Sequence, residues 1–148
     1  MFRGSAPAKI DDKGRLKIPT DFRRSLEEQY GPDVELFVTS IEGDSAWLYP
    51  LPVWEEIEHR LGGMPATDRV KARFLERVSY FGQQSRLDTQ GRLLLPQILR
   101  ESAGMNGEVV VSAHLDHLRV WNRERFAQRL EQQPFTDQDF QALSERGI

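Results

Sequence analysis

Apolar and polar side chains alternate on both sides of a glycine near the start of the chain. Ala8 and Ile10 precede Gly14, and Leu16 and Ile18 follow it. Alternation with a period of two places these apolar side chains on one face of two strands, so the pattern predicts a β-hairpin. Glycine suits the turn because it adopts positive φ without a Cβ penalty. The proline after Ile18 cannot donate a ladder hydrogen bond and is expected to end the second strand.

This hairpin pattern occurs twice. Residues 11–19 read DDKGRLKIP and residues 88–96 read DTQGRLLLP, with Asp, Gly, Arg, Leu and Pro at matching places. The offset is 77 residues at every shared position. Five identities in nine positions predict two copies of one unit, with a second hairpin over 83–96.

Each hairpin pattern is followed by a similar series of elements. In the first unit we expect a short helix capped by Thr20-Asp21 and ended near Gly31, then strands over 34–39 and 47–49. A helix over 53–61 follows. The second unit repeats this order, with a short helix closed by a glycine, two strands and two terminal helices.

A connector over 62–82 joins the two units. Thr67 or Asp68 is expected to cap its helix, since both side chains can accept hydrogen bonds from free backbone N–H groups. The helix carries apolar side chains at helical spacing, which we interpret as core packing. They are Val70, Phe74, Val78 and Phe81.

The order of elements is β-β-α-β-β-α, repeated. Halves of about 75 residues bury too little surface for separate cores, so we expect one α+β fold with strands of both halves interleaved in a small barrel. The predicted organisation is a single fold over 1–148. Its parts are a first repeat at 5–52 with a helix at 53–61, a connector at 62–82, a second repeat at 83–125 and C-terminal helices at 126–148.

Composition narrows the class of protein. The chain has 148 residues and no cysteine, which excludes disulfides and thiolate metal sites. It lacks an apolar run long enough to span a membrane, and its first residues lack the hydrophobic core of a signal peptide. We therefore expect a cytoplasmic protein without a membrane partner.

Charge is unevenly distributed. The formal net charge is −3, but residues 1–24 carry seven basic and three acidic side chains, a local charge of +4. Residues 133–148 carry −2. A local basic patch, rather than the total charge, decides whether a protein attracts nucleic acid. Charge alone would favour a simple solvated face.

Three motifs in combination resemble the MraZ family. They are the opening MFRG at 1–4, the paired D-x-x-x-R at 11–15 and 88–92, and LYPLP followed by Trp54. The resemblance extends to about residue 145. It implies a double-split β-α-β barrel of the AbrB-like group and a bacterial, nucleoid-associated transcriptional regulator of the division and cell-wall gene cluster. It also implies a ring-shaped homo-oligomer that binds short direct repeats in double-stranded DNA of its own promoter.

The resemblance carries DNA contact to both D-x-x-x-R copies. The first copy has more cations, because Gln90 and Leu94 replace Lys13 and Lys17 in the second, so we expect the first to dominate. Arginine can grip guanine or phosphate with two donors, whereas lysines are expected to bind phosphate. The predicted DNA-binding residues are Arg3, Lys9, Asp11, Lys13, Arg15, Lys17, Arg86, Asp88 and Arg92. The alternative for each Asp–Arg pair is an ion pair that merely fixes the turn.

Two other classes of protein compete with this interpretation. An enzyme would need a catalytic or metal site. The three histidines, His59, His114 and His117, form no convincing set of metal ligands. The chain also has no nucleophile elbow or phosphate-binding loop. We therefore expect no enzymatic activity, metal, cofactor or small-molecule substrate. A ring-forming assembly protein would instead use aromatic side chains such as Trp47 and Trp121 as interface anchors. Salt-dependent DNA affinity separates it from a regulator.

Overall fold

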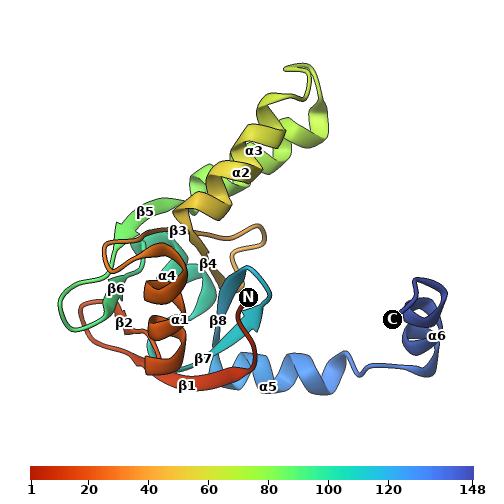
Figure 1. The fold of residues 1–148 in the computed structure, drawn as a ribbon. Helices are drawn as coiled ribbons and strands as arrows, with labels where there is room; N and C mark the ends of the chain where they lie inside the picture. The colour runs from red at the N-terminus through yellow and green to blue at the C-terminus, as the bar shows by residue number, and fades with distance from the viewer.

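The computed structural model describes all residues 1–148 as an eight-stranded sheet with six helices (Figure 1). The strands are β1 (Ser5–Ile10), β2 (Arg15–Lys17), β3 (Glu35–Thr39), β4 (Ala46–Pro50), β5 (Gln83–Arg86), β6 (Arg92–Leu94), β7 (Gly107–His114) and β8 (His117–Asn122). The helices are α1 (Thr20–Tyr30), α2 (Leu51–Gly62), α3 (Arg69–Tyr80), α4 (Gln97–Ala103), α5 (Arg123–Gln132) and α6 (Asp137–Glu145). The predicted α+β class is confirmed.

The sheet curls into a nearly closed antiparallel barrel. Its strand order is β5-β3-β4-β8-β7-β1-β2-β6. The two edge strands, β5 and β6, are consecutive in the chain, so the turn between them brings the two edges of the sheet together without ladder pairing. The predicted barrel is therefore confirmed, and the short strands leave it split where β5 and β6 part.

The second hairpin differs from the prediction. Its turn forms, with Asp88 N donating to Arg92 O at 2.9 Å, but β5 and β6 share no ladder pairing. Instead β5 pairs with β3 over four residues and β6 pairs with β2 over three. Each of the two strands pairs with a partner from the other half of the chain, so β5 and β6 diverge on the two sides of the turn. The first hairpin is also short, with Ile10↔Leu16 as its strand pair.

Strands of the two halves interleave in pairs around the barrel. The pairs β1–β7, β2–β6, β3–β5 and β4–β8 each join the first half of the chain to the second. Inward-facing side chains from both halves fill one core cluster of 21 buried residues. Leu16 and Leu93, which face each other at the centre of β2–β6, have no exposed surface. Burying each such leucine contributes about 1.5–3 kcal/mol.

Two prolines begin the helices that follow the turns. Pro19 caps α1 and Pro96 caps α4, each with φ near the value that its ring fixes and without a side-chain capping bond. The predicted cap at Thr20-Asp21 was therefore wrong by one residue. Helix α1 ends at Gly31 with φ of 92°, as the glycine predicted. It buries Phe22 and Leu26 against the barrel.

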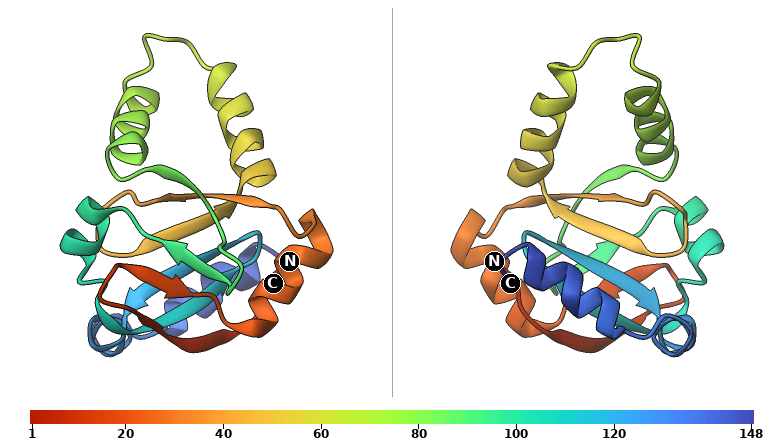
Figure 2. Two further views of the ribbon diagram at one scale, coloured as in Figure 1. Left: turned by 90° about the vertical axis from the view of Figure 1, so that its left-hand side faces the viewer. Right: turned by 90° about the vertical axis from the view of Figure 1, so that its right-hand side faces the viewer.

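Helices α2 and α3 form an arm that projects from the barrel (Figures 1 and 2). Asp68 caps α3 by accepting from Val70 N and Lys71 N. The predicted core stripe of α3 is only half correct. Val78 and Phe81 are buried near the barrel, but Val70 is 62% exposed. The reason is that the outer part of α3 has only α2 to pack against.

The C-terminal elements extend to the other side. Helix α5 packs along β7 and β8, and Phe126 stacks on Trp121 at 5.6 Å between ring centroids. Helix α6 lies beyond it, apart from the barrel and the arm (Figure 1). Thr136 caps α6 in a reciprocal capping box with Asp139. No helix of the structure combines the length and apolar character that crossing a membrane requires.

The interleaved strands generate a prediction about folding. We propose that residues 1–148 are one folding unit, because a fragment of residues 1–66 lacks every strand that pairs β1, β2, β3 and β4 with the second half. We expect this fragment to be unfolded, or to self-associate through its open strand edges. Circular dichroism and light scattering would measure both properties, with the full chain as control. A fragment that is monomeric and melts cooperatively would refute the proposal.

Candidate nucleic-acid interface

The first D-x-x-x-R turn is built around the carboxylate of Asp11. One oxygen accepts from the backbone N–H groups of Lys13 (3.0 Å) and Arg15 (2.9 Å). The other accepts from the side-chain Nε of Arg15 at 2.7 Å. Gly14 completes the turn with φ of 81°, where a side chain would be strained. The five residues therefore close the turn with their own hydrogen bonds.

The second turn has the same geometry. Asp88 accepts from the backbone N–H groups of Gln90 and Arg92, both at 2.9 Å, and from Arg92 Nε at 2.8 Å. Gly91 has φ of 75°. Both ion pairs use Nε, and neither arginine bonds another protein group through its Nη atoms. The side chains of Arg15 and Arg92 remain 30% and 26% exposed.

These hydrogen bonds change the acidity of both aspartates. The backbone N–H of Arg15 has the largest effect and lowers the pKa of Asp11. Desolvation opposes it, but the side chain of Arg15 and the backbone N–H of Lys13 add to the lowering, so the pKa lies below 3.8. The backbone N–H and side chain of Arg92 lower the pKa of Asp88 in the same way. Both carboxylates thus stay ionised at neutral pH and hold the arginines in place.

The two turns lie at opposite ends of one antiparallel ribbon made of β2 and β6. Arg15 pairs with Leu94, Leu16 with Leu93 and Lys17 with Arg92. Two further hydrogen bonds extend this ladder into the turns, from Ile18 N to Gly91 O at 3.0 Å and from Leu95 N to Gly14 O at 3.1 Å. The position of each turn therefore depends on the strand that leaves the other turn.

The outer face of this ribbon is basic. Leu16 and Leu93 point into the core, so the alternation of the strands turns Arg15, Lys17 and Arg92 outward. Lys17 and Arg92 stand directly opposite each other, and like charges in that position repel. Lys17 has no carboxylate partner, and Lys13 is exposed at the tip of the first turn. We define the basic ribbon as Lys13, Arg15, Lys17 and Arg92.

The other predicted cations lie outside the basic ribbon. Lys9 is exposed on β1 opposite Glu108, and Arg86 bonds Glu35 at 3.2 Å, so an acid stands beside each of them. Arg3 precedes β1 near the Phe2↔Leu115 bridge, at the end of β1 away from the Asp11 turn. The structure thus brings four predicted cations together and separates three.

Sequence reasoning missed two arginines that pack on the turns. The Arg100 guanidinium of α4 lies against Gly14, where any Cβ would overlap it, and the Arg23 guanidinium of α1 lies likewise against Gly91. Arg100 also donates from Nε to Leu95 O at 3.0 Å. Each half of the chain thus braces the turn of the other half. The signal was available, since Arg23 and Arg100 are also 77 residues apart.

The histidines occupy a different part of the barrel. His117 is 7% exposed, stacks on Tyr49 at 4.3 Å and lies 2.8 Å from Asp116 through Nδ1. Arg119 Nε donates to its other ring nitrogen at 3.2 Å, and burial lowers the pKa of His117. The ring is therefore neutral and packed. No group of three or more His, Cys, Asp or Glu side chains is placed to hold a metal ion.

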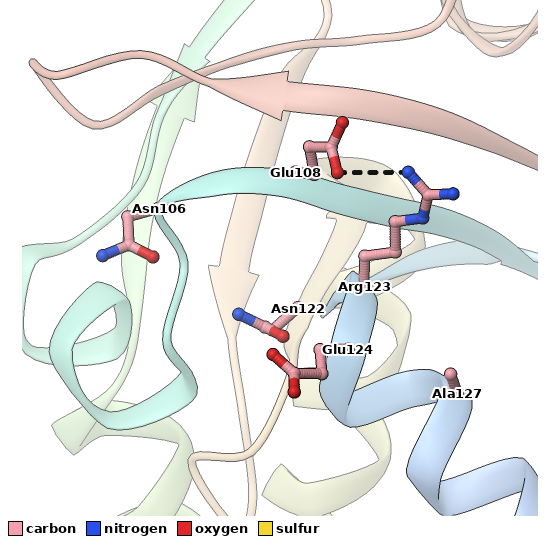
Figure 3. Close-up of a pocket in the computed structure, with 6 residues that line it drawn as sticks. All are labelled: Asn106, Glu108, Asn122, Arg123, Glu124 and Ala127. Atoms are coloured by element: carbon pink, nitrogen blue, oxygen red, sulfur yellow. Dashed lines mark hydrogen bonds and ion pairs between the residues drawn. The ribbon is translucent and has the colours of Figure 1, made fainter.

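A polar hollow lies between the start of β7 and the start of α5 (Figure 3). Glu108 and Arg123 face each other across its rim and form an ion pair at 3.1 Å. Asn106, Asn122 and Glu124 supply the remaining polar groups. The hollow contains no histidine or serine, so it offers no nucleophile–base pair of the kind that acyl transfer uses.

The aspartate pKa values predict how stability depends on acidity. A carboxyl whose folded pKa is depressed stabilises the fold fully above its unfolded pKa, and this contribution is lost as pH falls through the lower folded value. For Asp11 and Asp88 that range lies below 3.8. We expect the free energy of unfolding in urea to fall with acidification there, and to fall less steeply for Asp88→Asn. An unchanged slope in that variant would contradict the assignment.

The crossed packing of the arginines predicts crossed effects of mutation. Arg100→Ala should increase hydrogen exchange at the backbone amides of Lys13 and Arg15, and Arg23→Ala at those of Gln90 and Arg92. The reason is that each truncation uncovers the turn of the opposite half. Arg24→Ala is the control, because Arg24 is exposed and pairs only with Asp21. Loosening of the turn in the same half would contradict the crossed arrangement.

Comparison with known proteins adds an independent finding. The model of the family described as "MraZ protein, putative antitoxin-like" matches residues 1–77 and 82–147. The protein of Acidobacterium capsulatum named transcriptional regulator MraZ is 49% identical over the full length of both chains. Proteins of the same name from Koribacter versatilis and Moorella thermoacetica are 42% and 36% identical, and the alignments cover all of this chain and 100% and 97% of theirs. On these grounds, the chain belongs to the MraZ family.

Proposed function

We propose that the chain is a sequence-specific DNA-binding transcriptional regulator, and that the basic ribbon is its DNA-binding surface. The relatives are named transcriptional regulators, which is not a class of enzyme. The observation that carries the proposal is the outward row of Arg15, Lys17 and Arg92 on two paired strands. A two-stranded ribbon fits the width of the DNA major groove, and its cations meet phosphate on either side.

Arg15 is proposed to read a base edge. Asp11 engages its Nε, which fixes the guanidinium plane and leaves both Nη groups to donate. A guanidinium held in this way loses little conformational freedom on binding, and its free donors suit the O6 and N7 acceptors of guanine. The ion pair that fixes the turn and the arginine that reads DNA are thus two roles of one arrangement. Arg92 has the same arrangement in the second turn.

Lys17 and Lys13 are proposed to bind phosphate. Lys17 faces Arg92 across the ribbon, and an anion between them relieves the repulsion of the two cations. Lys13 stands at the exposed tip of the first turn. Lys9, Arg86 and Arg3 are given a weaker role, since two have acidic neighbours and the third lies at the far end of β1.

We further propose that the chain acts as a homo-oligomeric ring on short direct repeats in its own promoter, at the division and cell-wall gene cluster in the nucleoid. One ribbon of a few cations gives weak binding by itself. Several ribbons on one assembly engage repeated sites together, and each further contact becomes intramolecular. Direct repeats suit subunits related by rotation in a ring, because each subunit meets its repeat in the same orientation.

An assembly protein without specific DNA binding remains the second candidate. Exposed apolar side chains on the arm and on α6, such as Val70 and Phe140, favour it. The two candidates separate when the full chain is titrated against DNA from upstream of its own gene and against random DNA, over a series of salt concentrations. Footprints at repeated sites and affinity that falls with salt support the regulator. Equal, weak binding to both DNAs would leave the assembly protein.

The roles of Arg15 and Lys17 predict different effects of their removal. Arg15→Ala should cost about 1–3 kcal/mol of binding free energy per engaged subunit and relax discrimination at one base position. Lys17→Ala should weaken binding to all sequences alike and reduce the salt slope by about one, since it removes one phosphate contact. Affinities for operator and random DNA across a salt series would measure both effects.

The control for these variants is a charge of the same kind outside the ribbon. Arg24→Ala removes an exposed arginine of α1 that pairs only with Asp21. We expect its affinity and specificity to match those of the wild type. An Arg15→Ala protein that binds operator DNA as the wild type does, with only a lower melting temperature, would reduce Arg15 to a brace of the turn.

A further inference from the structure

The arm and the C-terminal helix each expose an apolar surface that the rest of the chain leaves uncovered. Between α2 and α3 an apolar groove of about 340 Å³ lies open to solvent. Its apolar lining consists of Ile57, Leu61, Met64, Val70 and Phe74. Because the arm projects from the barrel, no other element of the chain covers this groove (Figure 1).

Helix α6 presents the matching apolar face. Phe140 is 61% exposed and Phe135 is 58% exposed, and the two rings contact each other edge to face at 4.7 Å between centroids. Leu143 follows Phe140 at helical spacing and is only partly covered. The helix is well formed, with its capping box, yet it buries no residue against the rest of the chain. Apart from the contact between the two rings, its apolar side chains therefore remain largely open to solvent.

Charge favours the contact between these two surfaces. Two cations stand at the groove. Arg60 pairs with Glu56 of its own helix at 3.4 Å, whereas Lys71 is bonded to the backbone carbonyl of Met64 and to no acid. The segment over 131–145 carries four acidic side chains and no basic one. They are Glu131, Asp137, Asp139 and Glu145. Basic groups beside an apolar groove thus face an apolar helix with acidic neighbours.

We propose that the groove of the arm binds helix α6 of a second copy of this chain. An amphipathic helix in an apolar groove is a common mode of recognition, with its apolar side chains buried and its charges at the rim. The contact joins two different surfaces, the groove of one copy and the tail of the next. Such a contact forms closed rings when its rotation closes. This docking rests on the homo-oligomer of the proposed function and does not depend on DNA binding.

Two exposed positions allow the docking to be broken from either side. Val70→Glu places a charge in the groove, and Phe140→Asp removes the central aromatic side chain of the tail. Both residues are more than half exposed, so the barrel should fold normally. We expect light scattering to give a wild-type mass that is a multiple of 17.1 kDa, and a lower mass for each variant. Ile98→Glu, on the exposed side of α4, is the matched control and should keep the wild-type mass.

Mixing the two variants tests the pairing itself. The Val70→Glu chain keeps an intact tail and the Phe140→Asp chain keeps an intact groove, so their mixture should form heterodimers while each alone does not. A variant that keeps the wild-type mass, or a mixture that forms no heterodimer, would overturn the docking. A wild-type chain of 17.1 kDa at all concentrations would overturn both the docking and the homo-oligomer. DNA affinity, measured separately, would decide the regulator.

Cross-linking provides a second measurement that does not depend on breaking the assembly. The chain has no cysteine, so single introduced thiols react without background from the native sequence. Chains with Val70→Cys and chains with Phe140→Cys should form a covalent heterodimer when mixed and oxidised. The pair Ile98→Cys and Phe140→Cys gives the control level. A yield no higher than that level would overturn the docking. A chain that carries both Val70→Cys and Phe140→Cys gives a further check, since a cross-link formed only within that chain would also overturn it.

Discussion

The antiparallel pairing of β2 with β6 is the constraint on which the rest of this structure depends. Leu16 and Leu93 anchor it in the core, and the ladder continues into both turns through Gly14 and Gly91. Because the pair comes from opposite halves of the chain, the position of each turn in the barrel is fixed only when both halves have folded. Arg23 and Arg100 act in the same sense, since each covers the glycine of the opposite turn. The basic ribbon is therefore a product of the whole barrel.

The Asp–Arg pairs show why a structural role and a binding role need not compete. An ion pair through both Nη atoms of Arg15 would have consumed the donors that a base edge needs. The observed pair uses Nε and leaves them free. Three hydrogen bonds to Asp11 fix the turn, and the same bonds hold the guanidinium at the surface. The order that stabilises the loop also reduces the entropy that binding would cost.

The sequence predicts local turn structure better than it predicts which distant segments of the chain pack together. The two turns and the barrel follow from five identities repeated at an offset of 77, because a turn is encoded within a few residues. The parting of β5 and β6 depends on which distant strand each one pairs with. Likewise, helical spacing identified Val70 as apolar but not what covers it, and the cross-packing of Arg100 on Gly14 is a long-range contact. Packing between distant segments decided each of these outcomes.

The uneven charge of the chain has a consequence for how assembly and DNA binding fit together. The basic ribbon lies on one side of the barrel, while the acidic α6 extends on the other (Figure 1). A free acidic tail would repel the same phosphates that the ribbon attracts. A tail docked beside Arg60 and Lys71 of a neighbour has its negative charge offset by these cations, on the arm and away from the basic ribbon. Under the proposed docking, assembly thus keeps the negative net charge of the chain away from DNA, and each added subunit adds an unobstructed ribbon.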